Sequence, residues 1–253
     1  MDRKLWKKQY RSFPHFTCPR CGKGTLRKQQ DSFHQKEPRY IHNQLVADGI
    51  LGEVSSGRFS GFLVCSNTFC GEAVAVAGDY QEYYQHQFDY DTGEDTLFED
   101  TQFTPFFMRP APFMIEVPKT LCKEAKKHIE RAYDLFWVDN ASCANRLRIV
   151  AEYLLDQLDI PRKGPKGSRT NTRLDLADRI ALLEEARPGH EDSLNALRYV
   201  GNVGSHEGHM ELEELLDCFE LLEDAMIELL EERRAKLAEK ARRIIENKGK
   251  LQK

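Results

Sequence analysis

Four cysteines in two close pairs limit what the first half of this chain can fold into. Cys18 and Cys21 are separated by two residues, Cys65 and Cys70 are separated by four, and a glycine follows each pair. Paired cysteines beside glycine are typical of tight turns that let two thiolates reach one metal ion. The pattern predicts that the two turns come together around a single ion.

Zinc prefers four soft or borderline ligands in a tetrahedron, so we expect one Zn²⁺ bound by these four cysteines. Two alternatives stay open: the cysteines are buried thiols without metal, or His15 or His34 replaces one thiolate. Four protein ligands leave no position for water, which predicts a structural zinc that stabilises a small domain. The chain has seven cysteines, and this odd number favours a reducing compartment over a disulfide framework.

Charge is spread unevenly along the chain. The net charge is −4, so the chain as a whole has no electrostatic preference for nucleic acid. Residues 1–39 are nevertheless strongly basic, whereas residues 79–101 contain acidic residues and neither lysine nor arginine. The N-terminus lacks the apolar segment of a secretory signal and no run approaches a membrane span, so we expect a cytoplasmic protein that does not enter a membrane.

The composition changes near the middle of the chain and predicts two domains. Residues 1–104 are rich in glycine, aromatic and β-branched residues, with strand-like apolar runs at 61–65 and 73–77, and predict a β-rich zinc ribbon. Residues 105–118 contain four prolines and predict an extended connector. A helical domain is expected over 119–233, followed by a charged helical tail over 234–253.

Helical periodicity starts after the connector. Apolar stripes predict helices at 121–138, 141–158, 174–186 and 191–201, and a long helix from residue 211. Residues 161–173 combine glycine, proline and positive charge with nothing to pack, and predict a mobile basic loop.

The order of these helical motifs resembles a known family. The helix that begins Ala144-Asn-Arg-Leu-Arg, the basic loop, and then Leu197-Arg-Tyr-Val-Gly-Asn-Val-Gly-Ser-His206 are similar to a domain-of-unknown-function branch of the HEPN-like superfamily (higher eukaryotes and prokaryotes nucleotide-binding). The resemblance covers about residues 105–230. It implies an α+β two-domain protein: a small β-rich zinc ribbon followed by an all-α HEPN-like helical bundle. It also implies a homodimer in a prokaryotic setting near restriction or antiviral defence functions, with a protein partner there.

Many HEPN proteins are metal-independent endoribonucleases with an Arg-x(4–6)-His motif, so the resemblance implies that Arg198, Asn202 and His206 are catalytic. Here seven residues separate Arg198 from His206, which departs from that motif. The glycines at 201 and 204 are expected to break the helix between them.

Cleavage of RNA without metal needs a proton donor or acceptor and a cation for the developing phosphate charge. His206 supplies the first and Arg198 the second, as a bidentate phosphate ligand, while Asn202 orients one of them. Positive charge that gathers the RNA strand is expected from Arg146, Arg148, Arg162, Lys163, Lys166, Arg169 and Arg173.

Structural interpretations of the same motif stay open. Asn202 is then a helix C-cap, His206 is a buried histidine that fixes the turn, and Arg198 pairs with a carboxylate such as Glu152. Three functional hypotheses follow: a protein that acts on RNA and cleaves it, an adaptor that binds nucleic acid or a partner without catalysis, and a module that senses a nucleotide.

Overall fold

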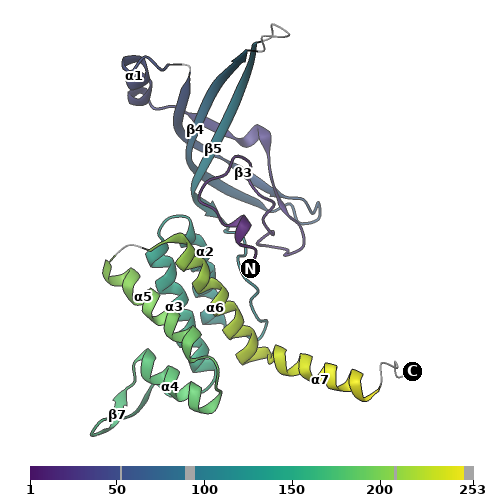
Figure 1. Cartoon of the computed structure of the whole chain (residues 1–253), viewed down its shortest axis with the longest axis vertical. Coiled ribbons are helices and arrows are strands. Elements are labelled where there is room, and N and C mark those ends of the chain that lie inside the picture. Colours follow the sequence, from purple (N-terminus) through teal and green to yellow (C-terminus); the bar gives the residue numbers. More distant parts are fainter. Residues whose placement is uncertain (52, 89–94, 208–209, 248–253) are drawn as a thin grey trace. The chain divides into compact units, whose positions relative to one another are not determined.

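The computed structural model describes residues 1–51, 53–88, 95–207 and 210–247, without the side chains of residues 85–88, 95–98 and 203–207. The chain forms two compact units. One comprises Asp2–Phe113 with Phe136–Val138, and the other comprises Met1, Met114–Leu135 and Asp139–Lys253. A sheet dominates the first unit and helices dominate the second (Figure 1).

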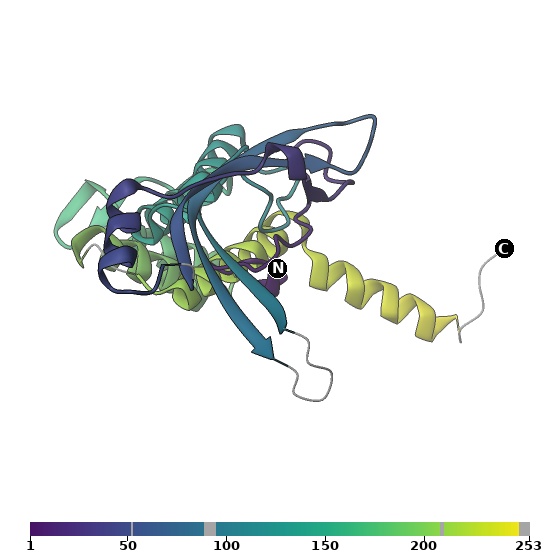
Figure 2. The same ribbon diagram turned by 90° about the horizontal axis from the view of Figure 1, so that it is seen from above.

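The N-terminal unit is built on an antiparallel sheet in the order β1-β3-β4-β5, with β2 also paired to β3. The sheet curls along its length (Figure 2). Its elements are short 3-10 turns at Arg3–Leu5 and Gln30–Ser32, β1 (Leu26–Lys28), β2 (His34–Lys36), α1 (Arg39–Ala47), β3 (Val54–Cys65), β4 (Ala73–Phe88) and β5 (Asp95–Arg109). The β1–β3 register pairs Leu26 with Cys65, which brings the two cysteine pairs to the same end of the sheet.

One face of this sheet is buried and the other faces solvent. Phe59 and Leu63 of β3 are buried, whereas Ser60 and Phe62 between them are exposed. This period of two is expected for a strand with one wet face. The N-terminal segment lies on the buried face and contributes to a cluster of aromatic rings: Tyr10, Phe13, Phe16, Phe33, Phe59 and Phe103.

The C-terminal unit packs helices around one apolar core. Its elements are α2 (Lys123–Phe136), α3 (Asn140–Gln157), β6 (Lys163–Lys166), β7 (Arg169–Arg173), α4 (Leu176–Ala186), α5 (Glu191–Glu207), α6 (Leu212–Glu231) and α7 (Arg233–Glu246). The predicted stripe of the second helix is buried from Leu147 to Leu155, and Phe219, Leu222 and Met226 of α6 are fully buried. None of the described helices is long and apolar enough to cross a membrane.

The predicted fold class, a small zinc ribbon followed by an all-α HEPN-like bundle, is wrong in both halves. The N-terminal unit is a curled sheet whose three main strands have 12, 16 and 15 residues. Only the short apolar runs in these strands were recognisable, because the remaining positions alternate with polar residues that face solvent. In addition, β5 extends to Arg109, so residues 105–109 belong to a strand.

The C-terminal unit is not all-α because residues 161–173, predicted as a mobile loop, contain the β6–β7 hairpin. Gly167 makes the turn with a φ of +59°, a left-handed conformation that glycine adopts without steric cost. The base of the hairpin is tied by a hydrogen bond from the Leu174 amide to the Arg162 carbonyl, at 3.0 Å. Most side chains of both strands are exposed, so they lack the apolar alternation by which strands are recognised.

Helix α5 also differs from the prediction. It continues to Glu207, six residues beyond the predicted end at Gly201. Gly201 is buried against α3, where a Cβ atom would lie 2.8 Å from the Cβ of Arg148. This close approach of α3 and α5 offsets the cost of glycine in a helix, which is about 1 kcal/mol relative to alanine.

Candidate metal centre and arginine pocket

The four paired cysteines converge at one end of the N-terminal sheet. Their sulfur atoms all lie within 4.8 Å of one another, with 3.8 Å between Cys18 and Cys70 and 3.7 Å between Cys21 and Cys65. None of the four forms a disulfide. Sulfurs bound to one tetrahedral ion at about 2.3 Å lie about 3.8 Å apart, so the arrangement is compatible with a metal site.

The first cysteine pair is held by a turn that follows Phe16. The Cys18 amide donates to the Gly24 carbonyl at 2.9 Å, and the Gly22 amide donates to the Cys18 carbonyl at 3.0 Å. Gly22 has a φ of +61°, which glycine tolerates best. The turn thereby directs both thiols of the pair to the same side.

The second pair begins at the end of β3. The carbonyl of Asn67 accepts from the amides of Cys70 and Gly71, at 2.9 and 3.0 Å. Gly71 has a φ of +58°, close to that of Gly22 in the first turn. Each cysteine pair therefore occupies a hydrogen-bonded turn that a following glycine completes.

Backbone amides also point at the sulfur atoms. The amide of Gly24 donates to the Cys21 sulfur at 3.3 Å, and hydrogen bonds from Gly24 and Lys23 lower the pKa of Cys21 to about 6. Burial instead raises the pKa of Cys65 to about 12. A bound cation would favour the thiolate at both positions, because metal ligation requires deprotonated sulfur.

Among the described residues, the group that could hold a metal ion consists of the four cysteines. His15 and His34, the alternative ligands, are both exposed and lie outside it. An ion held by four thiolates has no open coordination position. An ion bound by all four thiolates would hold the two turns together and would leave no coordination position at which it could activate water.

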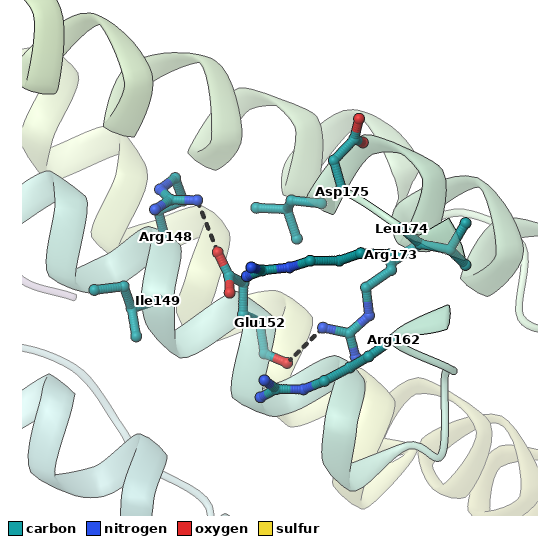
Figure 3. Close-up of a pocket in the computed structure, with 9 residues that line it drawn as sticks. Arg148, Ile149, Glu152, Arg162, Arg173, Leu174 and Asp175 are labelled. Atoms are coloured by element: carbon teal, nitrogen blue, oxygen red, sulfur yellow. Dashed lines mark hydrogen bonds and ion pairs between the residues drawn. The ribbon is translucent and has the colours of Figure 1, made fainter. Parts of the chain in front are cut away.

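A second site lies in the helical unit, in a pocket of about 430 Å³ between α3 and the start of α4. We call it the arginine pocket (Figure 3). Helix α3 contributes one side, and the two ends of the β6–β7 hairpin and the first turn of α4 contribute the other. Its lining residues are Arg148, Ile149, Glu152, Arg162, Arg173, Leu174, Asp175, Leu176 and Arg179.

Three of the four arginines are held by carboxylates of α3. Arg148 donates to Glu152 at 2.7 Å. Arg162 forms a two-bond pair with Asp156, whose Oδ1 also accepts from Arg179 at 2.7 Å. The hydrogen bond from Arg162, with the nearby charge of Arg179, keeps the pKa of Asp156 below its usual range. One carboxylate thus serves two guanidinium groups and leaves a surplus of positive charge.

Arg179 is the buried member of this group, with 3% of its surface exposed. Its guanidinium also donates to the carbonyls of Ile160 at 2.9 Å and Glu152 at 3.3 Å. Among the described residues its Nε has no hydrogen-bond acceptor. The lining of the arginine pocket therefore includes a buried cation with one donor that no described residue satisfies.

Arg173 differs from the other three arginines. Its side chain extends from the end of β7 into the pocket, beside Glu152 (Figure 3). Within the described part of the chain it forms no ion pair, and the residue is exposed. An exposed guanidinium without a carboxylate partner is the group in this pocket best placed to bind an added anion.

The remaining predicted nucleic-acid residues lie outside the arginine pocket. Lys163 and Arg169 are exposed on the hairpin, whereas Lys166 is held by Asp175 at 2.8 Å and by Asp178. Arg146 contacts the ring nitrogen of His128 at 3.5 Å on another face of α3. Sequence analysis missed Arg179, because an arginine in a helix is ordinarily expected at the surface. Its position among the apolar residues of α4 was the only sequence signal of its burial.

The predicted catalytic residues Arg198, Asn202 and His206 of α5 are not among the residues that line the arginine pocket. Arg198 donates to Asn195 at 3.0 Å and lies 4.0 Å above the ring of Tyr199. It does not pair with Glu152, which instead binds Arg148. Asn202 is exposed on a helix that continues past it, so it is not a C-cap.

His206 lies in α5, but its side chain is outside the described residues. Because the helix is unbroken, Arg198, Asn202 and His206 occupy positions i, i+4 and i+8 on one face. Gly201 packs on Arg148, so this helix borders the α3 surface that carries the pocket.

Two family comparisons match the chain. Residues 130–248 match a family described as Domain of unknown function (DUF4145), and residues 7–108 match one described as Domain of unknown function (DUF8608). No curated protein and no solved structure matches the chain. Both family descriptions are without an assigned activity, so the chemistry of the two sites carries the functional argument.

Proposed function

We propose that this protein binds single-stranded RNA through the arginine pocket, and that one structural zinc ion holds the cysteine turns of the N-terminal unit. The observation that carries the proposal is Arg173, whose guanidinium forms no ion pair with any described residue, in a pocket where one carboxylate already binds two other arginines. Guanidinium groups bind phosphate oxygens bidentately and without loss of charge at neutral pH.

The shape of the site favours a single strand over a duplex. A concave pocket of about 430 Å³ can receive one phosphate with its sugar or base, whereas the bases of a duplex are stacked inside a rod. Ile149, Leu174 and Leu176 give the pocket an apolar part beside its cations. A nucleotide that is turned out of a flexible strand has the matching combination of a flat apolar ring and a phosphate.

The test is direct binding of labelled oligonucleotides, measured by fluorescence anisotropy with single-stranded RNA, DNA of the same sequence and the RNA duplex. We expect the single-stranded RNA to bind most tightly. The logarithm of its binding constant should fall with the logarithm of salt concentration, with a slope of about −0.7 for each phosphate neutralised. Equal affinity for duplex and single strand, tighter binding of DNA, or no binding at 0.15 M salt would refute the proposal.

A second candidate, metal-independent cleavage of the bound RNA, is supported by the unbroken α5. The helix places Arg198 on the face where Asn202 and His206 follow at helical spacing, and Arg198 has no carboxylate partner among the described residues. Histidine can accept the 2′-hydroxyl proton while arginine stabilises the phosphate.

Cleavage is tested with His206→Ala, which should bind RNA normally and leave it intact. The wild-type protein should cleave in the presence of a chelator and produce ends with cyclic phosphate. Intact RNA after incubation with the wild-type protein would identify it as an RNA-binding protein without nuclease activity.

A further inference from the structure

The second cysteine turn presents a phenylalanine ring entirely to solvent. Phe69 is 100% exposed, whereas the exposed phenylalanines of the adjoining sheet, Phe62, Phe106 and Phe107, retain 41–45% exposure. Exposing an aromatic ring that could be buried costs about 1.5–3 kcal/mol. A ring on a hydrogen-bonded turn with no packing of its own points to a partner outside the described chain.

The turn that carries Phe69 is fixed by hydrogen bonds at both ends. The Asn67 side chain accepts from the Phe69 amide at 3.1 Å, and the Asn67 amide donates to the Cys65 sulfur at 3.4 Å. The Asn67 carbonyl accepts from the amide of Cys70 at 2.9 Å. Since Cys65 and Cys70 both belong to the sulfur cluster, the ring is carried on a preorganised support, which reduces the entropy lost on binding.

The first cysteine turn carries two exposed cations, Arg20 and Lys23. Its Gly24 approaches Asn67 so closely that a Cβ atom would lie 3.0 Å from the Asn67 Cβ, so the backbones of the two cysteine turns adjoin. Arg20 reaches Glu72 at 3.6 Å, yet its side chain is 70% exposed. An exposed pair of this kind is weak, so both cations are accessible to an anionic ligand.

We propose that Phe69 stacks on an unpaired base of a nucleic-acid strand, while Lys23 and Arg20 bind the neighbouring phosphates. Exposed aromatic rings together with cations are the combination by which proteins bind single strands with little sequence preference. A protein partner would bury the ring equally well, but the exposed cations of the adjoining turn favour a polyanion. The inference rests on the proposed function for its class of ligand and adds a second contact, on the N-terminal unit.

The test uses Phe69→Trp in the full-length protein. The native tryptophans, Trp6 and Trp137, are 2% and 3% exposed, so the introduced indole can be recognised by its long-wavelength emission and its quenching by acrylamide. Single-stranded RNA is added while anisotropy of a label on the RNA reports binding. We expect stacking to quench the indole as the complex forms, and acrylamide to lose access to it.

Two further substitutions separate stacking from apolar packing. Phe69→Ala should weaken RNA binding roughly 5- to 150-fold, the equivalent of about 1–3 kcal/mol per stacked base. Phe69→Leu keeps an apolar side chain without a π face and should weaken it nearly as much. Metal content and the melting curve of each variant should match the wild type, because Phe69 makes no packing contact.

The outcomes distinguish this inference from the proposed function. RNA that binds by anisotropy without any change in the indole, or a Phe69→Leu variant that binds as the wild type does, overturns the stacking proposal and leaves the arginine pocket standing. If saturating RNA still quenches the indole, and substitutions in the arginine pocket do not change RNA affinity, the stacking site is supported and RNA binding by the arginine pocket is refuted.

Discussion

Gly201 of α5 lies flush against the side chain of Arg148 on α3, where a Cβ atom on the glycine would be 2.8 Å from the Arg148 Cβ and 3.0 Å from its Cδ. The same arginine donates to Glu152 at the rim of the arginine pocket. A change at this helix contact should therefore affect both the stability of the helical unit and the position of a pocket residue.

Gly201→Ala should destabilise the helical unit, although alanine is ordinarily favoured over glycine in a helix by about 1 kcal/mol. The new methyl group meets the stem of Arg148 close to its backbone, where the side chain cannot swing away. We expect a loss of about 1–3 kcal/mol in the free energy of unfolding, measured by urea denaturation at 222 nm. Asn202→Ala, on the exposed side of α5, should be neutral or slightly stabilising, and a Gly201→Ala protein as stable as the wild type would contradict the close contact.

Arg179→Met should destabilise the protein by about 2–4 kcal/mol, because it removes a donor from the partly buried carbonyl of Ile160 and one partner of Asp156. Arg179→Lys keeps the charge but cannot reach Asp156 and the carbonyl of Ile160 in the same planar arrangement, so it should recover only part of the loss. Thermal denaturation of the wild type, Arg179→Met and Arg179→Lys compares their stabilities. Full recovery by lysine would show that charge alone matters at this position.

Asp156 should contribute to the dependence of stability on pH. Its pKa is lowered in the folded protein, chiefly by the hydrogen bond from Arg162. Its contribution is therefore complete above the ordinary aspartate pKa of about 3.9 and is lost as the pH falls through the lower folded value.

Urea unfolding of the wild type and Asp156→Asn between pH 2 and 6 checks this prediction. The wild type should be the more stable at pH 6, and the difference should shrink below pH 4. A difference that stays constant over this range would mean that the ionised carboxylate does not stabilise the fold.

Cys18→Ser and Cys70→Ser should each lose the metal. The purified wild type should contain one zinc per chain by elemental analysis and release it on thiol modification, because four thiolates form a closed site. Both variants should melt at a lower temperature, since binding free energy at such a site contributes to folding. Cys122→Ser lies outside the cluster and should keep its zinc; a wild-type protein without metal would contradict the assignment.

The sequence predicted the parts of this protein that have a strong local signal. The convergence of Cys18, Cys21, Cys65 and Cys70 is confirmed. It could be predicted because paired cysteines with following glycines have few other uses. The identity of the metal stays a prediction. The apolar stripes that predicted helices at 141–158 and from residue 211 are also confirmed, since Leu147, Leu154 and Phe219 are buried on those helices.

The parts that were missed depend on tertiary contacts. The β6–β7 hairpin has no apolar alternation, since it lies exposed beside α4 instead of in a core. Helix α5 passes through Gly201 because α3 packs on that residue, a contact that local propensity does not contain. Apart from its apolar neighbours in α4, nothing in the sequence indicated that Arg179 is buried, because its partners, Asp156 and the carbonyl of Ile160, come from another part of the chain.

The central claim is that the arginine pocket binds the RNA backbone, and charge reversal at Arg173 tests it most directly. Single-stranded RNA affinity should be measured at several salt concentrations for the wild type, Arg173→Glu and Arg242→Glu, the last being an equal charge change on the exposed α7. We predict that Arg173→Glu weakens binding at least about tenfold and flattens the salt dependence by about one phosphate contact, while Arg242→Glu changes neither. Equal losses in the two variants, or none in Arg173→Glu, would contradict the account.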